Sequence, residues 1–405
     1  MSSLRVCSRT THTARTASTL HSFKNVQMIR RRFDGHTRAI GRIRWAGYAE
    51  ELLDGGFLRG LSSHPAATGT TQAGQPPSRP SPAPLFTEPL TFPSAAVSQT
   101  GAVGAEVERD TTVVLHGLLG NGRNLRTFVN TLFKRMVRER ERQQPGALVE
   151  HQVLLMDLRH HGHTHAAGEY VPTTPDTLEN CARDVFETLR AYGASEPSDA
   201  GQGEKPLRII GHSLGGKVAL AAAQIATEDA FKRPCQVWTL DSFPFSFDET
   251  HKRNELGVLK ILETIEGIVQ PLESREELYE ILDGLGFQKN LQQWLASNLV
   301  GNPEEGYHWN FFLPGAFNLY RDYSRTDFTE MLRQKSDHSF GIVRALLSRG
   351  WDEESIGRLE QLRQVSREAG LGTHVHELDK AGHWLHAQNP DGLVDLMIES
   401  RKLLQ

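Results

Sequence analysis

The stretch that most constrains the fold is residues 207–220, where a Gly-x-Ser-x-Gly turn joins an apolar run to an alanine-rich run. The apolar run contains β-branched residues and predicts a strand that ends at Gly211, and the alanine-rich run predicts a helix. Gly211 and Gly215 stand two residues before and two residues after Ser213. On so tight a turn these two positions almost touch, so only glycine avoids a Cβ clash. The pattern therefore predicts strand, sharp turn and helix, with Ser213 raised on the turn.

A serine on such a turn is well placed to act as a nucleophile. The helix that follows points its N-terminus and the Leu214 N–H at the same spot, which favours a developing oxyanion. An acyl-transfer site also needs a second oxyanion donor. The run 111–115 predicts a buried strand, and the glycine-containing loop 116–120 after it offers the Leu118 N–H. We therefore predict Ser213 as the nucleophile and Leu118 and Leu214 as the oxyanion hole.

The same chemistry requires a general base, and the best candidate is His383. In sites with the chain order Ser, acid, His, the base lies in the loop after the last strand. The last strand is expected at 373–378, and His383 follows it beside Gly382. His386 is the neighbouring competitor but lies deeper toward the final helix, so we predict His383 as the base.

Two positions could supply the acid that orients the base. Asp241 directly follows the apolar run 235–240, at the carboxyl end of a strand. Asp352 stands after the penultimate strand, which is the usual position of the acid in sites with this chain order. Its neighbours, however, also fit the acidic first turn of a helix. Both strand ends meet at the carboxyl edge of a parallel sheet, so either carboxylate could reach His383. The residues alone leave Asp241 and Asp352 open.

The alternation of apolar strand runs with helical runs predicts an α/β fold. Strands that are apolar throughout are typical of a mostly parallel sheet covered by helices on both faces. One of the covering helices is expected to begin at Thr174-Pro175, with Pro in the first helical position. The expected strands are 111–115, 152–157, 207–210, 235–241, 340–347 and 373–378.

The alternation stops between residues 245 and 335. Apolar residues recur there at helical spacing, which predicts a helical cap inserted between strands and lying over the active site. The expected cap helices fall within 254–268, 276–286, 288–300 and 317–334.

The N-terminal region differs sharply in composition from the rest of the chain. Residues 1–45 hold nine Arg, one Lys and one acidic residue, as organelle transit peptides do. Residues 46–84 include a Pro-, Ser-, Ala- and Gly-rich stretch and are expected to be a disordered linker. We therefore expect one domain over residues 85–405, and a mitochondrial or plastid location with a cytoplasmic one as the alternative.

Composition also excludes several classes of protein. No run of eighteen apolar residues is present, so no membrane span is expected. The chain beyond residue 45 is acidic, which argues against a nucleic-acid partner. The three cysteines are far apart, and the histidine-rich loop 159–165 contains no carboxylate. We therefore expect no metal and no cofactor, and we expect Lys217 to be a packing or solvated residue.

Several motifs together resemble one subgroup of a known family. They span roughly residues 111–405 and read LHGLLGNGRNL, DLRHHGHT, GHSLGGKVAL, LDSFPF and AGHWLHAQNP. They resemble the α/β-hydrolases, and among these the subgroup of abhydrolase domain-containing protein eleven, its plant relatives and similar bacterial acyl-ester hydrolases. The resemblance implies that Asp241 is the acid and that Ser348 stands where other hydrolases keep theirs.

The resemblance also implies an activity. It points to a serine hydrolase that cleaves a small acyl ester or acyl thioester through an acyl-enzyme, with Ser213, His383 and Asp241 as the triad. Two alternatives keep the same fold. One is a C–C hydrolase or acyltransferase with the same triad, and the other is a non-catalytic ligand receptor or scaffold.

Overall fold

The computed structural model describes residues 84–100, 107–166, 172–192, 206–228, 231–248 and 257–400. The predicted transit peptide, residues 1–45, lies outside the described residues. So does the predicted linker, apart from its last residue.

Seven strands form the main sheet, in the order β1-β3-β2-β4-β5-β8-β9. Only β1 runs antiparallel to its neighbour; the other neighbouring pairs are parallel. The carboxyl ends of the parallel strands therefore meet at one edge. The strands are β1 (Thr87–Pro93), β2 (Glu108–Leu115), β3 (Val149–Met156), β4 (Leu207–His212), β5 (Gln236–Leu240), β8 (Ser339–Ala345) and β9 (Thr373–Leu378).

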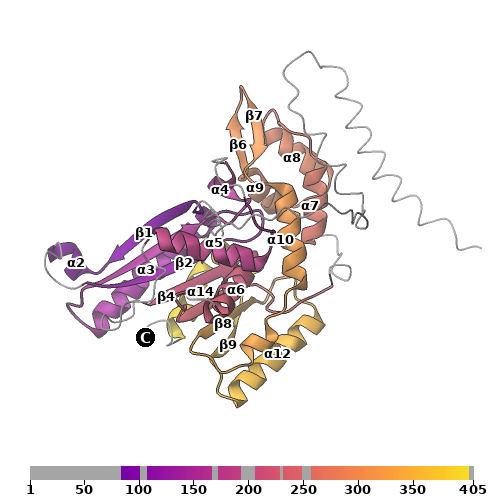
Figure 1. Ribbon diagram of the computed structural model, residues 1–405. Coiled ribbons are helices and arrows are strands. Elements are labelled where there is room, and N and C mark those ends of the chain that lie inside the picture. Colours follow the sequence, from indigo (N-terminus) through magenta and orange to yellow (C-terminus); the bar gives the residue numbers. More distant parts are fainter. Residues whose placement is uncertain are drawn as a thin grey trace, which may run out of the picture. The chain divides into compact units, whose positions relative to one another are not determined.

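Helices cover both faces of this sheet (Figure 1). Successive strand residues point to opposite faces, so Val113 packs with α5 and α6, and Val114 packs with α3 and α14. This is the predicted α/β fold. The helices of these layers are α3 (Arg126–Gln143), α5 (Leu178–Ala191), α6 (Leu214–Glu228), α12 (Glu353–Glu368) and α14 (Pro390–Glu399), with the short α2 (Ala95–Thr100), η1 (Gly122–Leu125), α4 (Gly162–Ala166) and α13 (Leu385–Gln388).

The helix expected to begin at Thr174-Pro175 begins three residues later. Thr177 is the N-cap of α5, and its side chain accepts a hydrogen bond from Asn180 N at 3.2 Å. The carbonyl oxygen of Pro175 instead accepts a hydrogen bond from the buried Arg159 guanidinium at 2.9 Å. A tertiary contact therefore replaces the first helical turn that the Pro pattern favoured.

Between β5 and β8 the chain forms a separate layer with its own apolar cluster, grouped beside one end of the sheet (Figure 1). It is not wholly helical. Residues 299–302 and 306–309 form a hairpin where a helix was expected as far as residue 300. Gly301 (φ 135°) and Gly306 (φ 82°) have positive φ values that other residues rarely adopt. The elements are α7 (Val258–Glu266), α8 (Arg275–Gly284), α9 (Lys289–Ala296), β6 (Leu299–Asn302), β7 (Gly306–Trp309), α10 (Leu313–Arg325) and α11 (Thr329–Leu332).

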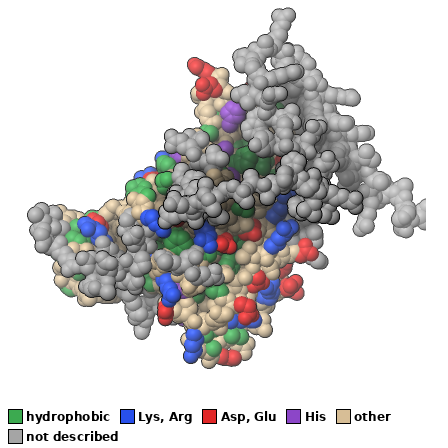
Figure 2. Space-filling model, in the orientation of Figure 1, with side chains coloured by type: hydrophobic (Ala, Val, Ile, Leu, Met, Phe, Trp, Pro, Cys, Tyr) green, Lys and Arg blue, Asp and Glu red, His purple; other side chains and the backbone are tan. Residues whose placement is uncertain are grey.

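The visible surface around α12 carries acidic and basic side chains mixed together (Figure 2). An example on this helix is Arg363, which pairs with Glu360 at 2.9 Å. Within the described ranges, none of the helices is both long enough and apolar enough to span a membrane.

Candidate active site

Ser213 occupies the sharp turn between β4 and α6. Its φ is 52°, a left-handed conformation that is strained for a residue with a side chain. A Cβ on Gly211 would lie 2.0 Å from the carbonyl oxygen of Gly215, and a Cβ on Gly215 would lie 2.6 Å from that of His116. The predicted clash within the turn is confirmed for Gly211, whereas Gly215 is required to be glycine by the end of β2 and the residue after it.

The loop 116–120 packs directly against this turn. Gly215 N donates to the His116 carbonyl at 3.1 Å, and a Cβ on Gly117 would lie 3.2 Å from the Cβ of Ser213. Gly120 N closes the loop by donating to the Gly117 carbonyl at 3.0 Å. Leu118 is therefore in a tight turn beside Ser213, and Leu214 is the first residue of α6.

His116 holds this loop, a role that the sequence did not reveal. It is fully buried, its Nδ1–H donates to the Gly117 carbonyl at 2.7 Å, and its Nε2 accepts from Leu158 N at 2.9 Å. Burial lowers the pKa of His116. A neutral ring with one donor and one acceptor fits both contacts, so the ring links the end of β2 to the loop after β3.

His383 and Asp241 form a hydrogen-bonded pair at the same edge of the sheet. His383 Nδ1 lies 2.8 Å from Asp241 Oδ2. The side chain of Asp241 is 1% exposed, whereas that of His383 is 40% exposed. The carboxylate is thus buried behind a ring that solvent can reach, which is the arrangement needed to fix the tautomer of a base.

Three further donors hold the Asp241 carboxylate. Oδ1 accepts from Ala345 N at 3.0 Å and from Trp351 Nε1 at 2.8 Å, and Oδ2 accepts from Ser348 Oγ at 2.6 Å. Burial raises the pKa of Asp241, but the hydrogen bonds from His383 and Ser348 outweigh it, so the pKa is lowered and the carboxylate stays ionised. The sequence did not indicate the contact from Trp351.

Asp352, the alternative acid, has a different position. It is the N-cap of α12, and its Oδ1 accepts from Ser355 N at 2.9 Å. A carboxylate there satisfies an orphan N–H of the helix and interacts favourably with the helix dipole. Asp241, and not Asp352, accepts the hydrogen bond from His383.

Two further histidines pack around His383. The His212 ring lies 4.8 Å from that of His383 and 4.7 Å from that of His386. His212 Nε2–H donates to the His383 carbonyl at 2.7 Å, so the residue before Ser213 anchors the backbone of the predicted base. Burial lowers the pKa of His386 to about 4 and that of His212 well below its usual value. Both rings are therefore neutral at physiological pH.

The histidine-rich loop is built into the protein by polar contacts of its own. Arg159 Nε donates to Asp184 at 2.7 Å, and His160 Nε2 lies 2.6 Å from Asp176. His161 Nδ1–H donates to the carbonyl of Arg159 at 2.7 Å. Across the described part of the chain, no three His, Cys, Asp or Glu side chains are grouped so that they could hold a metal ion.

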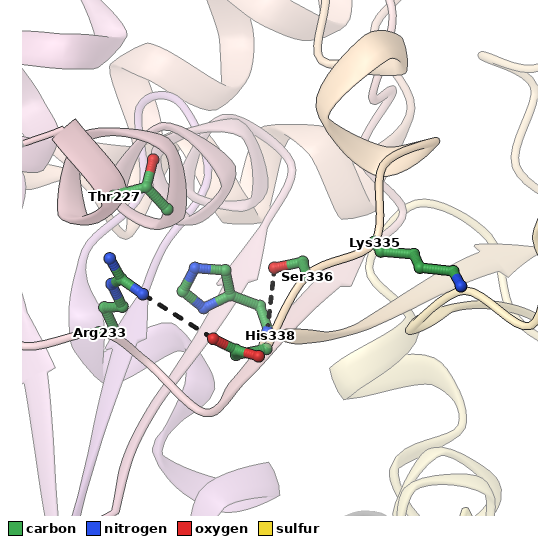
Figure 3. A pocket seen from close by; sticks show the side chains of 6 residues that line it. Thr227, Arg233, Lys335, Ser336 and His338 are labelled. Carbon is green, nitrogen blue, oxygen red and sulfur yellow. Dashed lines mark hydrogen bonds and ion pairs between the residues drawn. The ribbon is translucent and has the colours of Figure 1, made fainter.

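A pocket lies at the amino-terminal edge of the parallel strands, opposite the edge with Asp241 and His383. It contains none of the predicted site residues. It is lined by Thr227 of α6, by Arg233 and by residues 335–338, which precede β8 (Figure 3). Arg233 pairs with Asp337 at 3.8 Å, and the Lys335 side chain points away from the others. The chemistry predicted from the sequence therefore lies at the carboxyl edge, away from this pocket.

The fold and the strand–turn–helix around Ser213 define a hydrolase of the α/β class. The chain belongs to the alpha/beta hydrolase family, whose family model matches residues 112–396.

Two kinds of relative can be compared with the chain. The sn-1-specific diacylglycerol lipase ABHD11 of mouse is 25% identical over 288 residues, which is 70% of this chain and 78% of the mouse protein. A solved marine microorganism esterase is 21% identical with a TM-score of 0.53, covering 78% of this chain and 98% of the esterase. The peroxisomal alpha-beta-hydrolase Lpx1 of Saccharomyces cerevisiae is 13% identical with a TM-score of 0.51, covering 80% of this chain and 90% of Lpx1. The two solved structures share the fold.

Proposed function

We propose that this protein is a serine hydrolase that cleaves carboxylic ester or thioester bonds of acyl substrates through an acyl-enzyme. The observation that carries the proposal is the hydrogen bond from His383 Nδ1 to the buried Asp241 carboxylate, next to the strained turn that bears Ser213. A nucleophile, a base and an acid that orients the base are the minimum set for this chemistry.

In the proposed mechanism, Ser213 Oγ attacks the substrate carbonyl while His383 Nε2 takes its proton. Asp241 holds the ring through Nδ1 and stabilises the imidazolium that forms. The N–H groups of Leu118 and Leu214 receive the oxyanion, aided by the N-terminus of α6. His383 then protonates the leaving alcohol or thiol, and water releases the acyl group by the same steps.

An apolar acyl group suits the surroundings of this edge. Leu118 and Trp384, which adjoin the proposed oxyanion hole and base, both pack against the apolar cluster of the cap. Trp294 of α9 lies with its ring 5.8 Å from that of Trp384. The mouse relative is named as a diacylglycerol lipase, and its name supports an acyl ester as the substrate class for this chain.

Removal of the nucleophile tests the proposal. Ser213→Ala is expected to lower turnover of p-nitrophenyl esters by a factor on the order of 10⁶ and to abolish labelling by a fluorophosphonate probe. Ser366→Ala, which removes a buried serine hydroxyl from α12, is the matched control and is expected to keep both.

The outcomes separate the candidate functions. Wild-type protein that binds acyl ligands without labelling would identify a receptor or scaffold. Labelling without ester or thioester hydrolysis would point to a C–C hydrolase or acyltransferase. A pure Ser213→Ala sample with near wild-type ester hydrolysis would refute the nucleophile assignment.

A further inference from the structure

Lys217 is a fully buried cation four residues after Ser213 in α6. Its ammonium donates hydrogen bonds to three backbone carbonyl oxygens, those of Phe245 at 3.0 Å, Thr326 at 2.7 Å and Tyr323. An ammonium has three protons, so these contacts can use all of its donors. Lys217 lies in α6, the helix that directly follows the proposed nucleophile, and it donates to the backbone of other segments.

The three carbonyls belong to the two ends of the cap. The outgoing stem, residues 243–247, leaves the sheet after β5, and the returning stem, residues 323–328, leads back toward β8. The stems also pair with each other, because Phe247 N donates to the Ser324 carbonyl and Phe328 N donates to the Pro244 carbonyl, both at 2.8 Å. One side chain of α6 thus holds both stems against the helix that follows the Ser213 turn.

An aromatic ring adds a second contact to this cation. Lys217 Nζ lies 4.6 Å from the centroid of the Tyr323 ring, within the range of a cation–π interaction. The hydroxyl of Tyr323 accepts from Phe243 N at 3.1 Å and lies 3.5 Å from Ser242 Oγ. Ser242 directly follows Asp241, so the contacts continue from Lys217 to the turn that holds the proposed acid.

The residues between Lys217 and Asp241 are closely packed. A Cβ on Gly216, the neighbour of Lys217, would lie 2.5 Å from the Cβ of Ser242. The N-terminal turn of α6 and the acid turn are therefore in close contact. A displacement of the stems would reach Asp241 through the contacts of Tyr323 with Ser242 and Phe243, and small misplacements near a reacting centre are costly to the rate.

We propose that Lys217 is a positioning residue that fixes the cap stems, and through them the acid turn, relative to Ser213. Its own ammonium does not meet the substrate in this role. The part of the proposal that concerns rate rests on the proposed hydrolase function, whereas the part that concerns the stems does not.

Arg358 offers a comparison from the outer side of the same stems. Its guanidinium donates to the Ser246 carbonyl and to Asp327 Oδ2, both at 2.8 Å, and its side chain is 35% exposed. Water can replace such half-exposed contacts, but it cannot readily replace those of a fully buried ammonium. Arg358→Met is therefore expected to change hydrolysis less than Lys217→Met.

The kinetic test uses Lys217→Met, which keeps the length of the side chain and removes its donors. Active sites are titrated with a fluorophosphonate probe, and hydrolysis of p-nitrophenyl octanoate and acetate is measured per titrated site. We expect kcat/KM for the octanoate to fall by about tenfold or more, and to fall less for the acetate, because the larger acyl group depends more on the cap. Arg358→Met is expected to stay within about threefold of wild type.

A loss of stability alone predicts a different result. It would reduce the number of titrated sites and leave the kinetic constants per site unchanged, and that result would overturn the proposal. Arg208→Met is the control for removal of a buried cation. Arg208 lies at the far end of β4, is 4% exposed and contacts Asp110 at 2.6 Å. It is expected to lower stability without changing the constants per site.

A measurement on the wild-type chain keeps the proposal testable if Lys217→Met does not fold or if the protein hydrolyses no ester. Hydrogen exchange of the Phe247 and Phe328 amides reports the stems directly. Stems held by Lys217 should exchange as slowly as the amides of β5 and β8. Exchange as fast as that of exposed loops would overturn the proposal, whatever the activity of the protein.

Discussion

At the scale of single residues, the carboxylate of Asp241 accepts more hydrogen bonds than a simple pair with His383 would provide. It accepts hydrogen bonds from four donors, namely His383, Ser348, Trp351 and the Ala345 amide. A buried carboxylate with this many donors is ionised and can adopt only one orientation. The ring of His383 is oriented in turn, because Asp241 fixes Nδ1, and this leaves Nε2 for the proton transfer proposed above.

The first prediction compares the two aspartates that the sequence left open. Asp241→Asn is expected to lower turnover by a factor on the order of 10³–10⁴, because the amide can present its N–H to the ring and select the wrong tautomer. Asp352→Asn is expected to stay near wild type, because Asn also caps helices well. Steady-state hydrolysis of a p-nitrophenyl ester by both variants is the measurement. The opposite ranking would show that Asp352 is the acid.

At the scale of elements, the cap is fixed to the sheet domain at several points other than Lys217. Phe312 N, just before α10, donates to the carbonyl of His160 at 2.8 Å. His160 has a φ of 66° and its Nε2 is bonded to Asp176, whose other oxygen accepts from Asn318 of α10 at 3.1 Å. The histidine-rich loop therefore acts as a docking surface for α10.

The second prediction tests this contact with two glycines in helices. A Cβ on Gly315 of α10 would lie 2.3 Å from the His160 ring, which Asp176 holds in place. Gly315→Ala is therefore expected to destabilise the protein by about 1–3 kcal/mol. Gly357 of α12 has no atom within 4 Å of an added Cβ, and Gly357→Ala is expected to stabilise by about 0.5–1 kcal/mol. Urea unfolding of both variants is the measurement, and equal effects of the same sign would contradict the docking interpretation.

At the scale of the whole molecule, several histidines in the described part of the chain have pKa values below the ordinary one. Burial lowers the pKa of each of them, and for His376 and His386 the folded value is about 4. The unfolded chain keeps the ordinary value of 6.5. Those among them whose side chains are almost fully buried are His116, His161, His212 and His386.

The third prediction follows from this difference between the folded and unfolded states. Because the folded pKa values are depressed, the unfolded chain binds more protons below pH 6.5, and stability falls as the pH drops from there toward 4. The free energy of unfolding should therefore decrease between about pH 7 and pH 5. The His386→Asn variant should show a shallower slope than the wild type. Unfolding by urea at several pH values measures both slopes, and an unchanged slope in the variant would exclude His386 from the effect.

Local sequence was sufficient to predict the strand–turn–helix around Ser213 and the mostly parallel sheet. A Cβ on Gly211 would clash with residue 215, four residues on, so this constraint depends only on the local turn, whereas the clash at Gly215 is with the end of β2. The alternation of strands and helices is likewise a local pattern repeated along the chain. Prediction from the sequence was less successful where tertiary contacts or particular backbone conformations determine where an element begins and which kind it is. The start of α5 depends on Arg159, and the β6–β7 hairpin depends on two glycine conformations that favour a turn over a continued helix.

The arrangement of side chains around the Ser213 turn was decided by the tertiary structure. Asp241 and Asp352 both follow strands, and only the three-dimensional fold brings Asp241 to within 2.8 Å of His383. Lys217 looked like a packing or solvated residue because its three partners are backbone carbonyls more than twenty residues away, which no side-chain pattern records. Steric constraints between residues close in sequence can be predicted from the sequence, whereas hydrogen bonds to distant backbone groups depend on how the whole chain folds.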